Sequence, residues 1–248
     1  MQNAQLIGLS AQMALGRELE VIANNMANVT TTGFKARTTR FQEYLMPKAS
    51  AETFQRPDRR LSYVIDAATP LDLSQGPVEA TGNPLNVAIR GEAFFAVQTP
   101  QGERYTRNGA FEMNPQGQIV TSDGHLVLGD GGPIQISQQE TGLTIGPDGT
   151  VSTNQGNRGK VRLVTFADPQ GLTNAGGNLY SATAAPQPAG PQGRLEPGAL
   201  ERSNVRPVLA MSRMLEVNRV YQLVSDTVSR LDSLRGMAIQ RLADASAA

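Results

Sequence analysis

The sequence predicts an α+β protein, in which the two chain ends form a discontinuous helical, coiled-coil-like domain and a mainly-β domain is inserted between them. Three observations support this prediction. The first 30 residues have a helical apolar spacing, residues 205–243 have a seven-residue apolar repeat, and turn signals recur across residues 85–185. The expected segments are an N-terminal helix and turn (1–35), an extended connector (36–84), the β-domain (85–185), a Pro/Gly-rich linker (186–204) and a C-terminal helix (205–248).

The N-terminal segment predicts an amphipathic helix over residues 1–30. Its apolar residues recur after three or four positions, which places them on one side of a helix. A first set is followed by a second set on a neighbouring face: Leu6, Leu9 and Met13, then Leu15, Leu19, Ile22, Met26 and Val29. Three consecutive threonines and Gly33 then end the helix, because glycine accepts the left-handed backbone found after helix ends.

Residues 34–84 have little periodicity. The run Phe34–Met46 is compatible with either a strand or a helix, and Pro47 ends it. The rest is polar and rich in proline. We expect an extended connector with short strands at Leu61–Ile65 and Leu71–Leu73.

Residues 85–185 are typical of an all-β domain. Turn-forming pairs such as Asn108-Gly109 and Asp148-Gly149 separate short apolar runs. Val161–Phe166 is the strongest strand candidate, and the others lie at 85–89, 94–97, 119–120, 126–128, 134–136 and 143–145. Short strands at a spacing of about 8–12 residues indicate a sandwich or a barrel-like domain.

The C-terminal segment predicts one long helix. Its seven-residue repeat is Ala210, Val217, Val224, Leu231 and Ala238, and Val220, Thr227 and Leu234 each follow a member by three residues. Met214, Tyr221, Val228 and Leu242 widen the apolar face. A repeat sustained over about four heptads is typical of a coiled-coil-like helix.

The composition argues against several classes of protein. The 22 Lys and Arg residues balance the 22 Asp and Glu residues, which argues against a nucleic-acid partner and against a polybasic membrane-surface protein. The chain has no cysteine and one histidine, so it offers no thiolate metal site or cysteine nucleophile. His125 and the glycine-rich run 129–132 both fit turns. We therefore expect no enzymatic activity, cofactor, metal or small-molecule substrate.

No run reaches the length of about 18 apolar residues that a membrane span needs. The N-terminal residues also lack a basic segment followed by an apolar one, so we expect no transmembrane segment and no cleaved signal peptide.

Both terminal helices carry apolar faces with little local chain to cover them. They must pack on each other, on other subunits, or on both. Head-to-tail contacts that do not close into a ring would produce a helical filament. The alternative is that both faces are the ordinary core of a two-helix hairpin.

Three asparagines near the end of the first helix leave a similar choice. Asn24, Asn25 and Asn28 either form a polar helix end or hydrogen-bond across a subunit contact and fix its register. The full set of candidate subunit-interface residues is Leu6, Leu9, Met13, Ile22, Asn24, Asn25, Met26, Asn28, Gly33, Phe34, Asn204, Val217, Val220, Tyr221, Val224, Leu231 and Leu234.

Three blocks of the sequence resemble one family. Residues 23–35, ANNMANVTTTGFK, resemble the A-N-N-x-A-N-x-x-T-x-G-[FY]-K signature of flagellar rod and hook proteins. Residues 86–97 with 105–111 are similar to the block L-D-V-A-I-x-G-x-G-F-F-x-V followed by Y-T-R-x-G-x-F, and residues 198–205 to G-x-L-E-x-S-N-V.

This resemblance implies a structural subunit of the axial rod of the flagellar basal body. The chain looks most like a proximal-rod member, with a distal-rod member as the alternative. The resemblance implies that the partners are copies of the chain, other rod proteins and the flagellar type III export apparatus. It places the protein in the rod that crosses the periplasm, after export without a cleaved signal peptide. A secreted β-rich envelope binding module with a helical stalk is the alternative outside the family.

Overall fold

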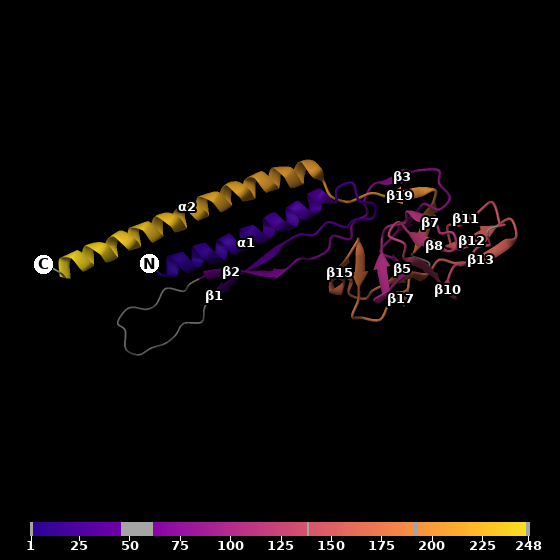
Figure 1. Ribbon diagram of the computed structural model, residues 1–248, viewed down its shortest axis with the longest axis horizontal. Coiled ribbons are helices and arrows are strands. Elements are labelled where there is room, and N and C mark those ends of the chain that lie inside the picture. Colours follow the sequence, from indigo (N-terminus) through magenta and orange to yellow (C-terminus); the bar gives the residue numbers. More distant parts are fainter. Residues whose placement is uncertain (1, 46–61, 138, 191–192, 247–248) are drawn as a thin grey trace. The chain divides into compact units, whose positions relative to one another are not determined.

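The computed structural model describes residues 2–45, 62–137, 139–190 and 193–246 (Figure 1). It has a helix at each end and a β-rich region between them, which confirms the predicted α+β class. Its contacts divide the chain into two compact units. Unit 1 takes its described residues from Met1–Ala27, Arg37–Pro70 and Arg206–Ala248, and unit 2 from Asn28–Ala36 and Leu71–Val205.

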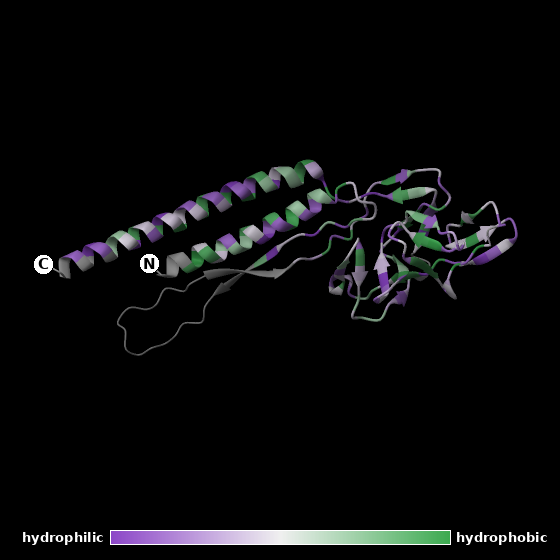
Figure 2. Cartoon of the chain, in the orientation of Figure 1, coloured by the Kyte–Doolittle hydropathy of each residue, from purple (hydrophilic) through white to green (hydrophobic). Residues whose placement is uncertain are grey.

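Unit 1 contains two long helices and a β-hairpin. Helix α1 spans Gln2–Ala27 and helix α2 spans Pro207–Ser246. The two helices pack along each other, and α1 also contacts strand β2 (Figure 1). Strands β1 (Arg40–Leu45) and β2 (Ser62–Ala68) pair antiparallel. Figure 2 shows polar and apolar residues alternating along α2, as an amphipathic helix requires.

The helix ends differ slightly from the predicted ones. Helix α1 stops at Ala27, three residues before the predicted end, because the asparagine side chain that follows forms a local turn. Asn28 Oδ1 accepts a hydrogen bond from Thr31 Oγ1 at 3.1 Å, and Gly33 adopts a φ of 67°. Helix α2 begins at Pro207, a residue whose fixed φ suits the first helical position.

Part of the strand prediction for residues 34–84 is confirmed. Residues 40–45 are extended rather than helical, and β2 overlaps the predicted strand Leu61–Ile65, of which Leu61 lies outside the described residues. The predicted strand Leu71–Leu73 is wrong, since only Leu71 forms a single β-bridge there. The backbone N–H and carbonyl of Leu71 pair with the side-chain amide of Gln170, so they are not available to a strand ladder.

Unit 2 is built from short antiparallel strands. In the described part of the chain, its largest sheet has ten strands, with the order β15-β16-β6-β5-β9-β8-β7 and with β10, β14 and β17 paired off this path. The others form the sheets β11-β12-β13, β18-β4 and β19-β3. The bounds are β3 Val78–Ala80, β4 Val87–Arg90, β5 Phe94–Thr99, β6 Gly102–Thr106, β7 Phe111–Met113, β8 Ile119–Thr121, β9 Leu126–Gly129, β10 Gly132–Pro133, β11 Thr144–Ile145, β12 Thr150–Thr153, β13 Gly156–Lys160, β14 Leu163–Thr165, β15 Thr173–Gly176, β16 Leu179–Ser181, β17 Gln187–Pro188, β18 Arg194–Pro197 and β19 Ala199–Glu201.

Two strand predictions in this region need correction. The strand predicted at Val161–Phe166 is shorter, because Val161 makes only an isolated bridge to Gly129 and β14 begins at Leu163. Residues 134–136 form no strand, although Ile134 and Ile136 are buried. Strands β3 and β17 to β19 lie within the ranges predicted as connector and linker, and the predicted domain ranges stay predictions.

Strand β5 separates two hydrophobic cores of unit 2. Phe95 and Val97 belong to one core, and Phe94 and Ala96 belong to the other. This strand is therefore apolar at consecutive positions, because both faces of the sheet are covered there. In the second core, Phe166 packs edge-on against Phe94, with ring centroids 5.9 Å apart.

Candidate assembly surface and buried charge cluster

The contact between α1 and α2 covers only one side of each helix. On α1, the buried side chains are Ala14, Glu18, Val21, Ile22 and Asn25. On α2, Val217 is buried, and Arg213 donates a hydrogen bond from Nε to Glu18 Oε1 at 2.7 Å. A Cβ at Gly8 would lie 2.5 Å from Val228 Cγ2, so this glycine permits the close approach of the helices.

Other faces of both helices expose large apolar side chains. Leu6, Leu9 and Met13 are 49%, 50% and 70% exposed, at helical spacings that place them on one face, and we call them the α1 stripe. Val208, Met211 and Leu215 are 77%, 56% and 64% exposed with the same spacing, and we call them the α2 stripe. Soluble monomers rarely expose contiguous apolar surfaces of this kind.

The structure divides the predicted interface residues into three groups. Leu6, Leu9, Met13, Asn24, Val220 and Leu234 are exposed. Met26, Asn28, Asn204, Tyr221, Val224 and Leu231 are half-buried, and Ile22, Asn25, Gly33, Phe34 and Val217 are buried within the chain. Their role in a subunit interface stays a prediction.

Asn25 and Asn28 have partners in their own chain. The Asn25 amide pairs with the Arg37 peptide, since Nδ2 donates to the carbonyl oxygen at 2.7 Å and Oδ1 accepts from the N–H at 3.0 Å. The hydroxyl of Thr31 donates to Asn28, as described above. These two side chains therefore stabilise the chain that follows α1.

An apolar groove of about 450 Å³ runs between α1 and α2. It is lined by Ile7, Gly8, Ala11, Val220, Leu223, Val224, Thr227, Val228 and Leu231. The Thr227 hydroxyl donates to the Leu223 carbonyl at 2.7 Å, so its polar atom is satisfied within the helix. The groove adds further apolar surface to unit 1.

Unit 2 contains a buried charge cluster that the sequence did not predict, formed by Lys35, Arg107 and Glu201. Lys35 Nζ donates to Glu201 Oε1 at 2.8 Å, and Arg107 Nε donates to Glu201 Oε2 at 3.2 Å. All three side chains are almost completely buried. The residues appeared only as letters of separate motifs, and no sequence signal pairs residues that are 166 and 94 positions apart.

Backbone groups complete the hydrogen bonds of this cluster. The N–H of Gly76 donates to Glu201 Oε1 at 3.0 Å. Arg107 Nη1 donates to the carbonyls of Gly91 and Ala93, at 2.6 Å each. Arg107 Nη2 lies 3.0 Å from Glu201 Oε2 but is not aligned for a hydrogen bond. Buried ions are tolerated only when hydrogen-bonded in this way.

The cluster contains two cations and one anion. Loss of hydration lowers the pKa of Lys35 below 10.5, the neighbouring Arg107 lowers it further, and Glu201 opposes both effects. Burial also lowers the pKa of Arg107.

We expect the lowered pKa of Lys35 to make the free energy of unfolding depend on pH. The folded protein releases the Lys35 proton at a lower pH than the unfolded chain, so the unfolded chain binds more protons in the window below pH 10.5. The contribution of Lys35 to the free energy of unfolding therefore rises with pH in that window. Urea unfolding should show a larger advantage of the wild type over Lys35→Met at pH 9.5 than at pH 7.

The comparison with Lys35→Met cancels the other titrations. Burial raises the pKa of Tyr105 to about 12, so its effect is a loss of stability above pH 10, shared by both proteins. A difference between the two proteins that does not change with pH would contradict the expectation.

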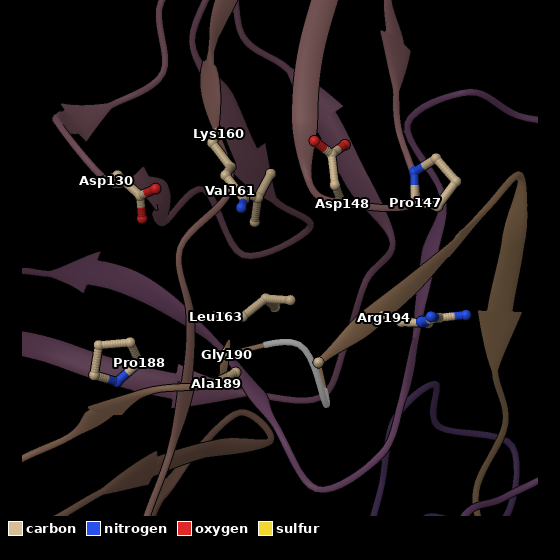
Figure 3. A pocket seen from close by; sticks show the side chains of 11 residues that line it. Asp130, Pro147, Asp148, Lys160, Val161, Leu163, Pro188, Ala189, Gly190 and Arg194 are labelled. Carbon is tan, nitrogen blue, oxygen red and sulfur yellow. The ribbon is translucent and has the colours of Figure 1, made fainter.

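A pocket of about 560 Å³ opens on unit 2 (Figure 3). Asp130, Asp148, Lys160 and Arg194 are its charged residues. Asp148 accepts hydrogen bonds from the N–H and the hydroxyl of Thr150, which lower its pKa and hold the local turn. The pocket therefore contains both acidic and basic side chains, and the Asp148 carboxylate is already hydrogen-bonded to Thr150.

The described residues contain no group of three or more metal-ligating side chains. Among the same residues, no helix has the length and apolar character to cross a membrane. The backbone of His125 is bonded to Thr121 in a turn, at the position where the sequence predicts one.

Three family models match the chain. The model of the flagella basal body rod protein matches residues 6–35, that of the flagellar hook protein FlgE/F/G D1 domain matches 88–153, and that of the flagellar basal body rod FlgEFG protein C-terminal matches 196–241. Each matched segment contributes one member of the charge cluster.

Curated relatives match over almost the full length. The chain is 38% identical over 245 residues to the flagellar basal-body rod protein FlgF of Caulobacter vibrioides, covering 98% of both chains. It is 33% identical to FlgF of Escherichia coli, over 98% of this chain and 99% of the relative. It is also 33% identical to FlgG of Bacillus subtilis, over 92% of this chain and 94% of the relative.

Proposed function

Because the chain belongs to the flagellar basal-body rod protein family, we propose that unit 1 joins it to neighbouring subunits through the exposed apolar faces of α1 and α2. The protein is a structural subunit of the flagellar basal-body rod, and its partners in assembly are rod proteins. We also propose that the protein has no enzymatic activity, that it lies in the proximal rod and that it is exported through the flagellar type III apparatus.

The observation that carries the interface proposal is the α1 stripe. Leu6, Leu9 and Met13 lie on one face of α1 and are 49% to 70% exposed, while another face of the same helix packs within unit 1. Burial of such side chains against a neighbour is favourable by about 25 cal/mol per Å² of apolar surface. A contact between different faces of two subunits extends into a helical assembly when its rotation does not close a ring.

Deleting residues 1–25 tests this function. We expect the deleted chain to be absent from purified basal bodies and the cells to lose swimming motility. Unit 2 should remain folded, which the amide NMR spectrum of the purified variant reports. The wild-type gene expressed at the same level is the control. Incorporation of the deleted chain into basal bodies with normal swimming would contradict an assembly interface on α1.

A further inference from the structure

The chain passes between the two units four times. The passages lie at residues 27–28, 36–37, 70–71 and 205–206. A force that passes along the backbone from one unit to the other must cross these positions. Each passage has one residue in unit 2. The bonds that unit 2 makes to these residues therefore decide how independently the four passages can move.

Within unit 2, the side chain of Asn204 connects the residues next to three of the four passages. Asn204 Oδ1 accepts from the N–H of Ala36 at 2.7 Å, and Asn204 Nδ2 donates to the carbonyls of Asp72 and Ser74 at 2.9 and 3.1 Å. The N–H of Asp72 also donates to the Ala36 carbonyl at 2.8 Å. The segments that begin or end at residues 36, 71 and 205 are thus bonded to one another.

The charge cluster joins the same three segments a second time. Lys35 Nζ bridges Glu201 Oε1 and the Ser74 carbonyl, at 2.8 and 2.7 Å. The N–H of Gly33 donates to the Glu201 carbonyl at 2.7 Å. Because Lys35 Nζ and the Glu201 carboxylate are buried, water cannot easily replace the bond between them when the segments are pulled.

We propose that Lys35, Glu201 and Asn204 form a clamp that holds three of the four chain passages as one body and thereby limits bending between the two units. Lys35 and Asn204 are positioning residues in this proposal. The stiffness matters to a rod subunit that carries torque, so its use rests on the proposed function. The clamp itself belongs to the single chain and can be measured without assembly.

Spin labels on the isolated protein test the clamp, because the chain has no native cysteine to interfere. One pair, Gln222→Cys with Gln101→Cys, reports on the distance between the units, and both positions are exposed. A second pair, Gln101→Cys with Gln116→Cys, lies within unit 2 and reports on its fold. Pulsed electron-spin measurements at a monomeric concentration give the width of each distance distribution.

We expect Lys35→Met and Asn204→Ala each to at least double the width of the distance distribution between the units. The width of the distribution within unit 2 should stay unchanged. Lys35→Met leaves Glu201 paired with Arg107, and Asn204→Ala removes no buried charge. Glu140→Gln is the matched control, since it breaks the 2.6 Å ion pair between Glu140 and Arg158, two residues that bond none of the clamp residues. Its distributions should match the wild type.

Two outcomes would overturn the clamp. One is an unchanged width between the units in Asn204→Ala while the unit 2 pair stays narrow. The other is an equal broadening in Glu140→Gln, which would show general softening of unit 2. If Lys35→Met also broadens the distance distribution within unit 2, the test of the clamp is the result for Asn204→Ala. Either failure leaves assembly through the helices untouched, because that is measured by incorporation into basal bodies.

Discussion

Glu201→Gln is expected to lower the free energy of unfolding of unit 2 by about 3–5 kcal/mol, the usual cost of breaking a buried ion pair by removing one partner. The carboxylate is the anion of the cluster, and its removal leaves Lys35 and Arg107 buried without their hydrogen-bonded counter-charge. The glutamine amide group also presents N–H donors to these cations. Urea unfolding monitored by circular dichroism, with NMR to report on unit 2, measures the loss.

Glu196→Gln is the matched control for this variant. The ion pair between Glu196 and Arg90 has the same short N–O distance of 2.8 Å, but the two side chains are 37% and 65% exposed. Exposed pairs contribute about 0–1 kcal/mol, so this variant should unfold close to the wild type. A loss below about 1 kcal/mol for Glu201→Gln would mean that water or a rearranged backbone solvates the two cations.

The triple variant Leu6→Gln, Leu9→Gln and Met13→Gln is expected to remain folded and to lose assembly. Each side chain is already 49% or more exposed in the single chain, and glutamine is a good helix former, so unit 1 should keep its helices. If a neighbouring subunit buries the exposed parts, their loss costs about 3 kcal/mol in total, or on the order of a hundredfold in affinity. Quantifying the subunit in purified basal bodies, together with swimming speed, measures this effect.

Arg17→Gln with Glu20→Gln provides the control on the same helix. These residues form an exposed ion pair, 3.0 Å apart, that makes little difference to stability. We expect normal incorporation of this double variant. Normal incorporation of the triple variant as well would show that the α1 stripe does not contact a neighbour.

The sequence predicted the regular elements where the signal was local. The apolar spacing of residues 6–29 and the repeat from Ala210 to Ala238 identified both helices, and turn pairs identified the β-rich region. It failed at Leu71–Leu73, because the backbone of Leu71 is paired by the side chain of Gln170, which lies 99 positions away. The asparagines gave an intermediate case: their residue type left a polar helix end and a subunit contact both open, and only the structure showed that Asn25 bonds to Arg37.

The sequence by itself determined the fold class, the amphipathic faces of both helices and the three motif blocks that place the chain in its family. These properties depend on residues that are close together, because helical and strand spacing repeats within a few positions. Only the tertiary structure decided which apolar residues are already covered within the chain and which stay exposed. It alone brought Lys35, Arg107 and Glu201 together, because a buried ion pair is selected by the geometry of the packed chain and leaves no periodic signal along it.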